Sequence, residues 1–332
     1  MDHLELIKQA KAKNFHPIYL LHGEEALFID QISDGIVESA LEEHERDFNL
    51  TTAYGKDADA LQLINEAKSY PTMAERRVVI LREAQSFSEI AELEPYMKSP
   101  NPQTIFILCY KYKKLDARSA IFKAIKANGV VFLAEKVKEY KMIDFIKRMA
   151  KEMGYNLSDK AAIMLFEFLG TDLSKIQGEL DKLSILVEKG SQINEVHVEE
   201  NIGISKDYNM FELTNAIAER DVPKAFQIVS YFEANPKNGP LVVVVGNLFR
   251  FFSQLMRMHF MKGASDGEIA QRVGMPPFAV NKSKPYLRVY NPKKISANIA
   301  TLHEYDLKSK GVDNSHFTEG ELMRELVFKL MN

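Results

Sequence analysis

Residues 17–28 are Pro17-Ile18-Tyr19-Leu20-Leu21-His22-Gly23-Glu24-Glu25-Ala26-Leu27-Phe28. The part from Pro17 to Leu21 is a short apolar run, which is typical of a buried strand. It ends at His22-Gly23, and the amphipathic stretch from Ala26 to Glu43 that follows predicts a helix. A phosphate-binding loop is built in the same order, from a strand, a glycine-containing loop and a helix. This loop is therefore the place to test whether the chain binds a nucleotide.

Strand-like runs alternate with helix-like stretches as far as residue 140. The further predicted strands are Phe48 to Ala53, Val78 to Leu81, Thr104 to Leu108 and Gly129 to Leu133, and helices are predicted over Asp57 to Lys68 and Ala117 to Ala127. The runs at Val78 and Thr104 are continuously apolar and rich in β-branched residues, which suits strands buried on both faces of a parallel sheet. The pattern predicts an α/β domain with a parallel five-stranded sheet, assigned to residues 1–140.

The sequence after Lys141 predicts only helices. Met142 to Met153 is amphipathic and ends at Gly154, and Ser158-Asp159 opens a second helix that runs to Leu169. Asp172 caps a third helix, and a short helix near His197 to Ile202 completes a small three-helix domain, assigned to residues 141–208.

A polar segment, Ser205 to Asn209, precedes an all-α domain assigned to residues 209–332. The predicted helices of this domain are Phe211 to Glu219, Val222 to Glu233, Pro240 to Lys262, Ser265 to Val273, Phe278 to Arg288, Asn291 to Gly311 and Thr318 to Met331. The stretch from Leu241 to Met261 is apolar enough to need a membrane check. Arg250 and Arg257 interrupt it, and a central arginine costs about 2.5–3.5 kcal/mol on insertion scales. We expect a buried helix and no membrane span.

The composition is that of a soluble globular protein. Of the 332 residues, 46% are hydrophobic and 27% are charged, and the net charge of −3 gives no overall basic field for nucleic acid. Any DNA contact must therefore come from a local patch.

Cys109 is the only cysteine, so an internal disulfide is excluded. It lies in an apolar run, which favours a buried thiol over a nucleophile. The N-terminal residues do not resemble a signal peptide, so a cytoplasmic location is expected.

The loop after the first strand lacks the groups that bind a triphosphate. A phosphate loop needs glycines that free its backbone amides, a lysine for the phosphates and a Ser or Thr for magnesium. Residues 22–28 contain a single glycine and no such lysine, and they place Glu24 and Glu25 where phosphates would lie. Two carboxylates repel a phosphate group, although they also suit the positive N-terminus of the next helix. On either interpretation, this loop does not hold ATP, and no cofactor is expected.

Other catalytic patterns are also missing. Arg82 follows the strand Val78 to Leu81, at the place where a metal-binding aspartate would be needed, and Glu83 alone is uninformative. No G-x-S-x-G or H-E-x-x-H motif occurs, and the eight histidines are scattered. We therefore expect no catalytic or metal site in this chain. An ATPase with a displaced nucleotide site stays open as an alternative, which titration with ATP and magnesium would decide.

Four segments together resemble the delta subunit family of the bacterial DNA polymerase III clamp loader. They are Ile18 to Ile29, Ser69 to Leu81, Gly170-Thr171-Asp172-Leu173 with Glu179 to Leu183, and Met210 to Ile217. They occur in the family's order and extend over nearly the whole chain. The resemblance implies an AAA+-like domain with a degenerate phosphate loop over residues 1–140, a lid over 141–208 and an oligomerisation collar over 209–332.

The resemblance also implies a function and partners. Such a subunit binds the ring-shaped sliding clamp (the beta subunit) and opens it for loading onto primed DNA. The neighbouring gamma/tau and delta prime subunits complete the complex, and ATP is bound and hydrolysed by neighbouring subunits. The holoenzyme is a DNA-directed DNA polymerase that works at the replisome on the nucleoid, in the cytoplasm.

The family's clamp-binding element falls on Tyr70, Pro71, Thr72 and Met73. The family usually has two large apolar residues at the last two positions, and Thr72 departs from that pattern. Methionine suits an adaptable apolar pocket, and aromatic residues dominate interface hot spots. The alternative is that Tyr70 and Met73 cover the edge of the sheet from inside.

A different class of function competes in the last domain. Residues 265–275, with Ser265 and Glu268 as a capping box, resemble the first helix and turn of a helix-turn-helix, and Phe278 to Leu287 could be its recognition helix. Pro285 would break that helix, and Asn281 is its one residue suited to base edges. A local basic run could instead contact the DNA backbone or form a solvated face; it consists of Lys282, Lys284, Arg288, Lys293 and Lys294.

Overall fold

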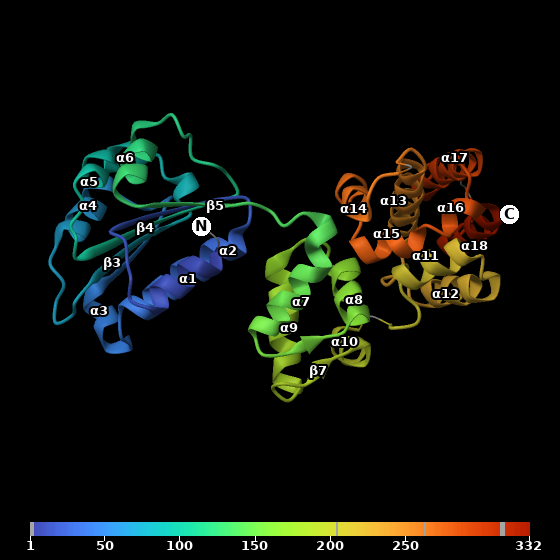
Figure 1. Ribbon diagram of the computed structural model, residues 1–332, viewed down its shortest axis with the longest axis horizontal. Coiled ribbons are helices and arrows are strands. Elements are labelled where there is room, and N and C mark those ends of the chain that lie inside the picture. Colours follow the sequence, from blue (N-terminus) through green and yellow to red (C-terminus); the bar gives the residue numbers. More distant parts are fainter. Residues whose placement is uncertain (1–2, 204, 262, 313–315) are drawn as a thin grey trace. The chain divides into compact units, whose positions relative to one another are not determined.

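The computed structural model in Figure 1 describes residues 3–203, 205–261, 263–312 and 316–332. The chain divides into two compact units, Met1–Lys136 and Val137–Asn332. The first unit ends close to the predicted boundary at residue 140. The second unit contains both predicted helical domains, so the boundary between residues 208 and 209 stays a prediction.

The first unit is built on a parallel five-stranded sheet, as predicted. Its strands are β1 (Ile18–Gly23), β2 (Leu50–Tyr54), β3 (Arg77–Arg82), β4 (Thr104–Lys111) and β5 (Val130–Ala134). Their order across the sheet is β2-β3-β4-β1-β5, and every pairing is parallel. The central strands β1, β3 and β4 are buried along most of their length, which explains their apolar sequences.

Helices cover both faces of this sheet. Figure 1 shows α1 and α2 on one side and α4, α5 and α6 on the other. Their bounds, with that of the short helix α3, are α1 (His3–Lys11), α2 (Ala26–Ala40), α3 (Arg46–Asn49), α4 (Ala60–Lys68), α5 (Glu94–Lys98) and α6 (Ala120–Asn128). One side of the core joins Leu20, Val79 and Phe106 from the sheet to Leu63 and Ile125 from the helices.

Several predicted boundaries in this unit are wrong by a few residues. Strand β2 begins at Leu50, because Phe48 and Asn49 belong to α3. Helix α4 begins at Ala60 and not at Asp57, since the Asp59 side chain accepts a hydrogen bond from the backbone N–H of Gln62 and caps the helix there.

The second unit begins with four helices, α7 (Met142–Glu152), α8 (Asp159–Leu169), α9 (Leu173–Leu186) and α10 (Glu195–Ile202). Ser158 and Asp172 cap α8 and α9 through their side chains, as predicted. The two-residue strands β6 (Asn156–Leu157) and β7 (Gln192–Ile193), which pair in parallel, are not predicted from the sequence. They are too short to show a periodic pattern.

The remaining helices of the second unit enclose an apolar core. They are α11 (Met210–Glu219), α12 (Val222–Ala234), α13 (Leu241–His259), α14 (Asp266–Val273), α15 (Pro277–Ser283), α16 (Tyr286–Val289), α17 (Pro292–Ser309) and α18 (Glu319–Met331). Helix α13 is long and apolar enough to cross a membrane by length and composition alone. In this fold one face of α13, including Leu248, Phe252 and Leu255, is buried in the core of the unit.

Two predicted helices of this unit differ in the structure from the predicted ranges. The helix expected over Phe278 to Arg288 is two short helices, α15 and α16, because Pro285 stands between them and cannot continue the hydrogen bonding of α15. Helix α13 ends at His259, and the predicted end at Lys262 lies outside the described residues.

Candidate functional site

The loop after β1 is closed by the backbone of its own domain. The backbone N–H groups of Glu24 and Glu25 both donate to the carbonyl oxygen of Ala134, at 2.8 and 3.1 Å. Gly23 has a φ of +135°, and its N–H donates to the carbonyl of Lys113 at 3.0 Å. A phosphate loop needs such N–H groups directed at the ligand. Here they are already used by β5 and by the segment after β4.

The side chains of this loop are also engaged. His22 is buried, and its Nδ1 accepts a hydrogen bond of 3.1 Å from the backbone N–H of Leu115. Burial, with a smaller contribution from the charge of Lys114, lowers the pKa of the His22 imidazole. Glu25 is buried and Glu24 is exposed. The loop therefore presents one exposed carboxylate and one buried carboxylate where a nucleotide would need cations.

Arg82 and Lys111, at the ends of β3 and β4, form an ion-pair network with α2. Arg82 at the end of β3 pairs with Asp34 of α2, with 2.6 Å between Nη2 and Oδ1. Lys111 Nζ, at the end of β4, lies 2.8 Å from Asp30 Oδ1 of the same helix.

Burial raises the pKa of the Cys109 thiol to about 12, as expected for a structural cysteine. Among residues 3–203, 205–261, 263–312 and 316–332, no three His, Cys, Asp or Glu side chains form a metal-binding group.

We predict that the isolated chain does not bind ATP. Isothermal titration with ATP and magnesium should give no heat of binding up to about 1 mM nucleotide, because the loop offers neither free amides nor a cation. A known ATP-binding clamp-loader subunit titrated in the same buffer is the positive control. Saturable binding in the micromolar range would contradict the prediction and favour a displaced nucleotide site.

The turn between α4 and β3 displays two large apolar side chains to solvent. Tyr70 is 79% exposed and Met73 is 97% exposed, while Thr72 is also exposed and Pro71 is partly buried. The alternative in which Tyr70 and Met73 cover the sheet edge from inside does not agree with these exposures. Met73 has a φ of +54°, a left-handed conformation that non-glycine residues seldom adopt.

Both ends of this turn are anchored. The N–H of Ser69, which follows the last residue of α4, donates to the carbonyls of Asn65 and Glu66. At the start of β3, the Arg77 guanidinium pairs with the carboxylate of Glu66 and donates to the carbonyl of Phe48 at 3.2 Å. The turn is therefore a short exposed segment between two fixed points.

Asn49 connects the turn to α3. Its Oδ1 accepts from the backbone N–H of Thr72 at 2.7 Å, and its Nδ2 donates to the carbonyl of the same residue at 2.9 Å. This contact is not predictable from the sequence. Asn49 lies 23 positions before Thr72 and inside a predicted strand, and a single asparagine has no spacing pattern that could be recognised.

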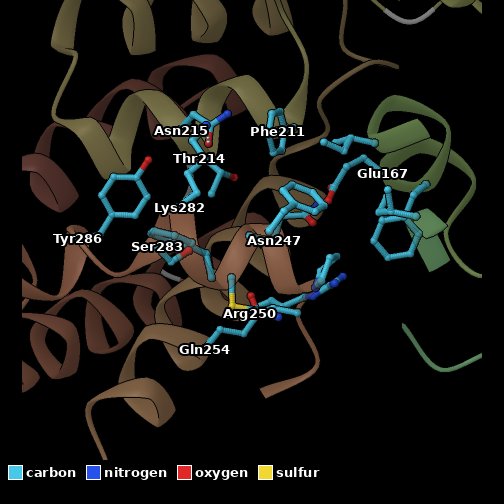
Figure 2. A pocket seen from close by; sticks show the side chains of 18 residues that line it. Glu167, Phe211, Thr214, Asn215, Asn247, Arg250, Gln254, Lys282, Ser283 and Tyr286 are labelled. Carbon is cyan, nitrogen blue, oxygen red and sulfur yellow. Dashed lines mark hydrogen bonds between the residues drawn. The ribbon is translucent and has the colours of Figure 1, made fainter. Parts of the chain in front are cut away.

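The second unit contains a cavity of about 120 Å³ among α7, α8, α11, α13 and α15. Figure 2 shows Lys282, one of the predicted DNA contacts, on the same side of this cavity as Thr214 and Asn215. Its Nζ lies 2.9 Å from Asn215 Oδ1 and 5.2 Å from the centre of the Phe211 ring. Lys282 is therefore held against α11.

The other basic residues of the predicted run differ in their surroundings. Lys284 Nζ lies 2.5 Å from Asp266 Oδ1, so part of its charge is neutralised. Arg288 and Lys293 are exposed, and Lys294 is partly buried near the start of α17. DNA contact through these five basic residues stays a prediction.

The helix-turn-helix interpretation is not supported by the geometry of this region. The predicted capping box is present: Glu268 N–H donates to Ser265 Oγ at 3.3 Å, and Ser265 N–H donates to the Glu268 carboxylate at 2.9 Å. The would-be recognition helix, however, is only the seven residues of α15, in which Val280 and Ser283 are buried. Such a short helix cannot lie along a major groove with several side chains on the bases.

The parallel sheet with helices on both faces, followed by helical regions, agrees with the predicted AAA+-like fold, and here the loop after β1 is closed by its own backbone. Residues 19–135 match the family described as "DNA polymerase III, delta subunit", and residues 207–324 match "DNA polymerase III delta subunit, C-terminal domain". The chain therefore belongs to the DNA polymerase III delta subunit family, whose members are clamp-loader subunits.

Individual relatives agree with this assignment over nearly the full length. The chain is 26% identical to DNA polymerase III subunit delta of Bacillus subtilis, with 96% of this chain and 95% of that protein covered. It is 19% identical to the probable DNA polymerase III subunit delta of Aquifex aeolicus, over 88% and 86% of the two chains. The solved structure of the Bacillus subtilis DNA clamp loader delta protein has the same fold, with a TM-score of 0.58, 24% identity and 99% coverage of both chains.

Proposed function

We propose that this chain binds the sliding clamp through the turn from Tyr70 to Met73 and helps to open the ring for loading onto primed DNA. It does so without binding or hydrolysing ATP. Gamma/tau and delta prime subunits complete the complex in the cytoplasmic replisome, ATP is bound and hydrolysed by neighbouring subunits, and the DNA-directed DNA polymerase activity lies elsewhere in the holoenzyme. Residues 141–208 serve as the lid and residues 209–332 as the collar that joins the complex.

The exposure of Tyr70 and Met73 is the observation that carries this proposal. An exposed tyrosine and methionine on one short turn lose contact with water only when a partner covers them, and aromatic side chains are frequent anchors of protein interfaces. Methionine adapts its shape to an apolar pocket. The same turn carries no charged side chain between Tyr70 and Met73, so an apolar groove on the partner suits it better than a charged surface.

The closed loop after β1 supports the part of the proposal in which this chain does not bind or hydrolyse ATP. The amides that would bind phosphate donate to Ala134, and Arg82 pairs with Asp34 where a metal ligand would be needed. This loop therefore supports a subunit that does not draw energy from nucleotide. The free energy for opening the clamp then comes from contact with the clamp and from the neighbouring subunits.

The first test is direct binding to the purified sliding clamp of the same organism. Surface plasmon resonance with the clamp immobilised should give a saturable signal with a Kd of about 1 μM or tighter, or roughly −8 kcal/mol. Bovine serum albumin on a reference surface controls for nonspecific binding. Failure to saturate at about 100 μM protein would refute the proposed function.

A further inference from the structure

Asn49 is a fully buried polar residue whose hydrogen bonds are all directed at the backbone. Besides the two bonds to Thr72, its Nδ2 donates to the carbonyl of Glu45 at 3.0 Å. Its Oδ1 therefore has a donor, and both hydrogens of its amide have acceptors. A buried amide is tolerated when its bonds are made, and it is costly when they are missing. The side chain is thus held in one orientation by α3.

The side-chain amide of Asn49 binds both the backbone N–H and the backbone carbonyl of Thr72. The side chain of Thr72 is exposed, so nothing in the packing of that side chain holds the turn. The two bonds from Asn49 resemble those between neighbouring strands, with one N–H donated and one carbonyl accepting. These two hydrogen bonds fix the backbone of the residue directly before Met73.

Met73 is the residue most in need of such support. Its left-handed backbone is unfavourable for a side chain with a Cβ and persists only where neighbouring structure imposes it. Asn49 fixes the residue before Met73, and the pairing of β3 fixes the chain from Arg77 onward. Without Asn49 the segment from Tyr70 to Met73 has one fewer fixed point and more accessible conformations.

We propose that Asn49 is a positioning residue that holds the turn from Tyr70 to Met73 in the conformation that binds the clamp. This inference rests on the proposed function, because it concerns the same surface. Asn49 is buried and does not touch the clamp; it acts through the backbone of Thr72. A turn that is already ordered loses less conformational freedom on binding, which strengthens affinity without any added contact.

The Asn49→Ala variant should bind the clamp about ten-fold more weakly, because two hydrogen bonds that order the turn are lost. Surface plasmon resonance measures the change. Asn101→Ala is the matched control, since Asn101 donates to Lys68 at the end of α4 at 3.5 Å and does not contact Thr72. We expect the control to bind within about two-fold of the natural protein. Equal affinity of both variants and the natural protein would overturn the inference.

A double-mutant cycle separates positioning from general loss of stability. If Asn49 acts through the turn, Asn49→Ala should cost less in a Met73→Ala background, where one of the presented side chains is already missing. The four proteins need to be compared at the same temperature, below the unfolding transition of each. Additive effects, with the same fold-change in both backgrounds, would count against the proposal.

Hydrogen exchange in the natural protein provides a test that needs no variant. The Thr72 amide lies in an exposed turn, yet its bond to Asn49 should slow its exchange at least about ten-fold relative to an unstructured peptide. Exchange at the unstructured rate would refute the positioning role even if Asn49→Ala fails to fold. A natural protein that does not bind the clamp refutes the proposed function instead, whatever the exchange rate of Thr72.

Discussion

Replacing Tyr70 and Met73 together by alanine is expected to weaken binding to the sliding clamp by about a hundred-fold or more. Each side chain is an exposed apolar anchor, and truncating an interface hot spot costs about 2 kcal/mol or more. Two such losses exceed the roughly 2.7 kcal/mol that corresponds to a hundred-fold change in Kd. Surface plasmon resonance against immobilised clamp measures the effect, and the single variants should each show part of it.

The stability of the double variant should be unchanged, because neither side chain is packed in the unbound chain. Thermal unfolding should show a melting temperature within about 2 °C of the natural protein, as is usual for surface substitutions. The matched control replaces Tyr54 and Leu61, which are 55% and 67% exposed in the same unit but lie outside the turn. If the control variant loses affinity as strongly as the turn variant, the turn is not the specific anchor.

The second large effect is expected at Gly23, where alanine should lower the free energy of unfolding by about 3–5 kcal/mol. An added Cβ would lie 2.2 Å from the carbonyl oxygen of Ala134, which is a backbone atom, and the position of the Cβ is fixed by the backbone of residue 23, so neither atom can turn aside. The φ of +135° is also unfavourable for any residue with a Cβ. The clash of the added Cβ with Ala134 is relieved only if the loop moves away from Ala134. That movement breaks the hydrogen bonds from Glu24 and Glu25 that close the loop.

Urea unfolding followed by circular dichroism measures this loss of stability. Gly35→Ala in α2 is the control, because a Cβ there meets nothing closer than 3.9 Å, from the side chain of Ile7. Alanine is the better helix former by about 1 kcal/mol, so the control should stabilise the protein slightly. A Gly23→Ala protein as stable as the natural one would show that the contact with Ala134 is not tight in solution.

The central strands were predictable because each is a continuous apolar run. Val78 to Leu81 and Thr104 to Leu108 lie in strands buried on both faces, and such strands show their character without any longer pattern. Strand β2 lies at the edge of the sheet and is partly exposed, so its start was misplaced by two residues onto Phe48. Pro285 is expected to break a recognition helix in this region, and it does separate α15 from α16. The predicted helix from Phe278 to Arg288 nevertheless runs across this proline, so that range is wrong.

The candidate site was predictable only in part, because some of its features depend on contacts between distant residues. The closed state of the loop depends on Ala134, more than a hundred positions after Gly23. The turn is hydrogen-bonded to Asn49 through Thr72, which is 23 positions away in the sequence. Local sequence shows which residues are missing from a phosphate loop. It does not show which carbonyl takes the place of the phosphate.

The carbonyl of Ala134 also bears on whether nucleotide binding could be engineered into this loop. Introducing a lysine and a threonine into residues 22–28 would restore the missing side chains but not the amides, which would still donate to Ala134. Freeing those amides means detaching the end of β5, two residues before the first unit ends. Restoring the side chains alone would therefore leave the backbone without free donors for a phosphate group. An engineer who wants an ATP-binding version would have to redesign the exit from the sheet together with the loop.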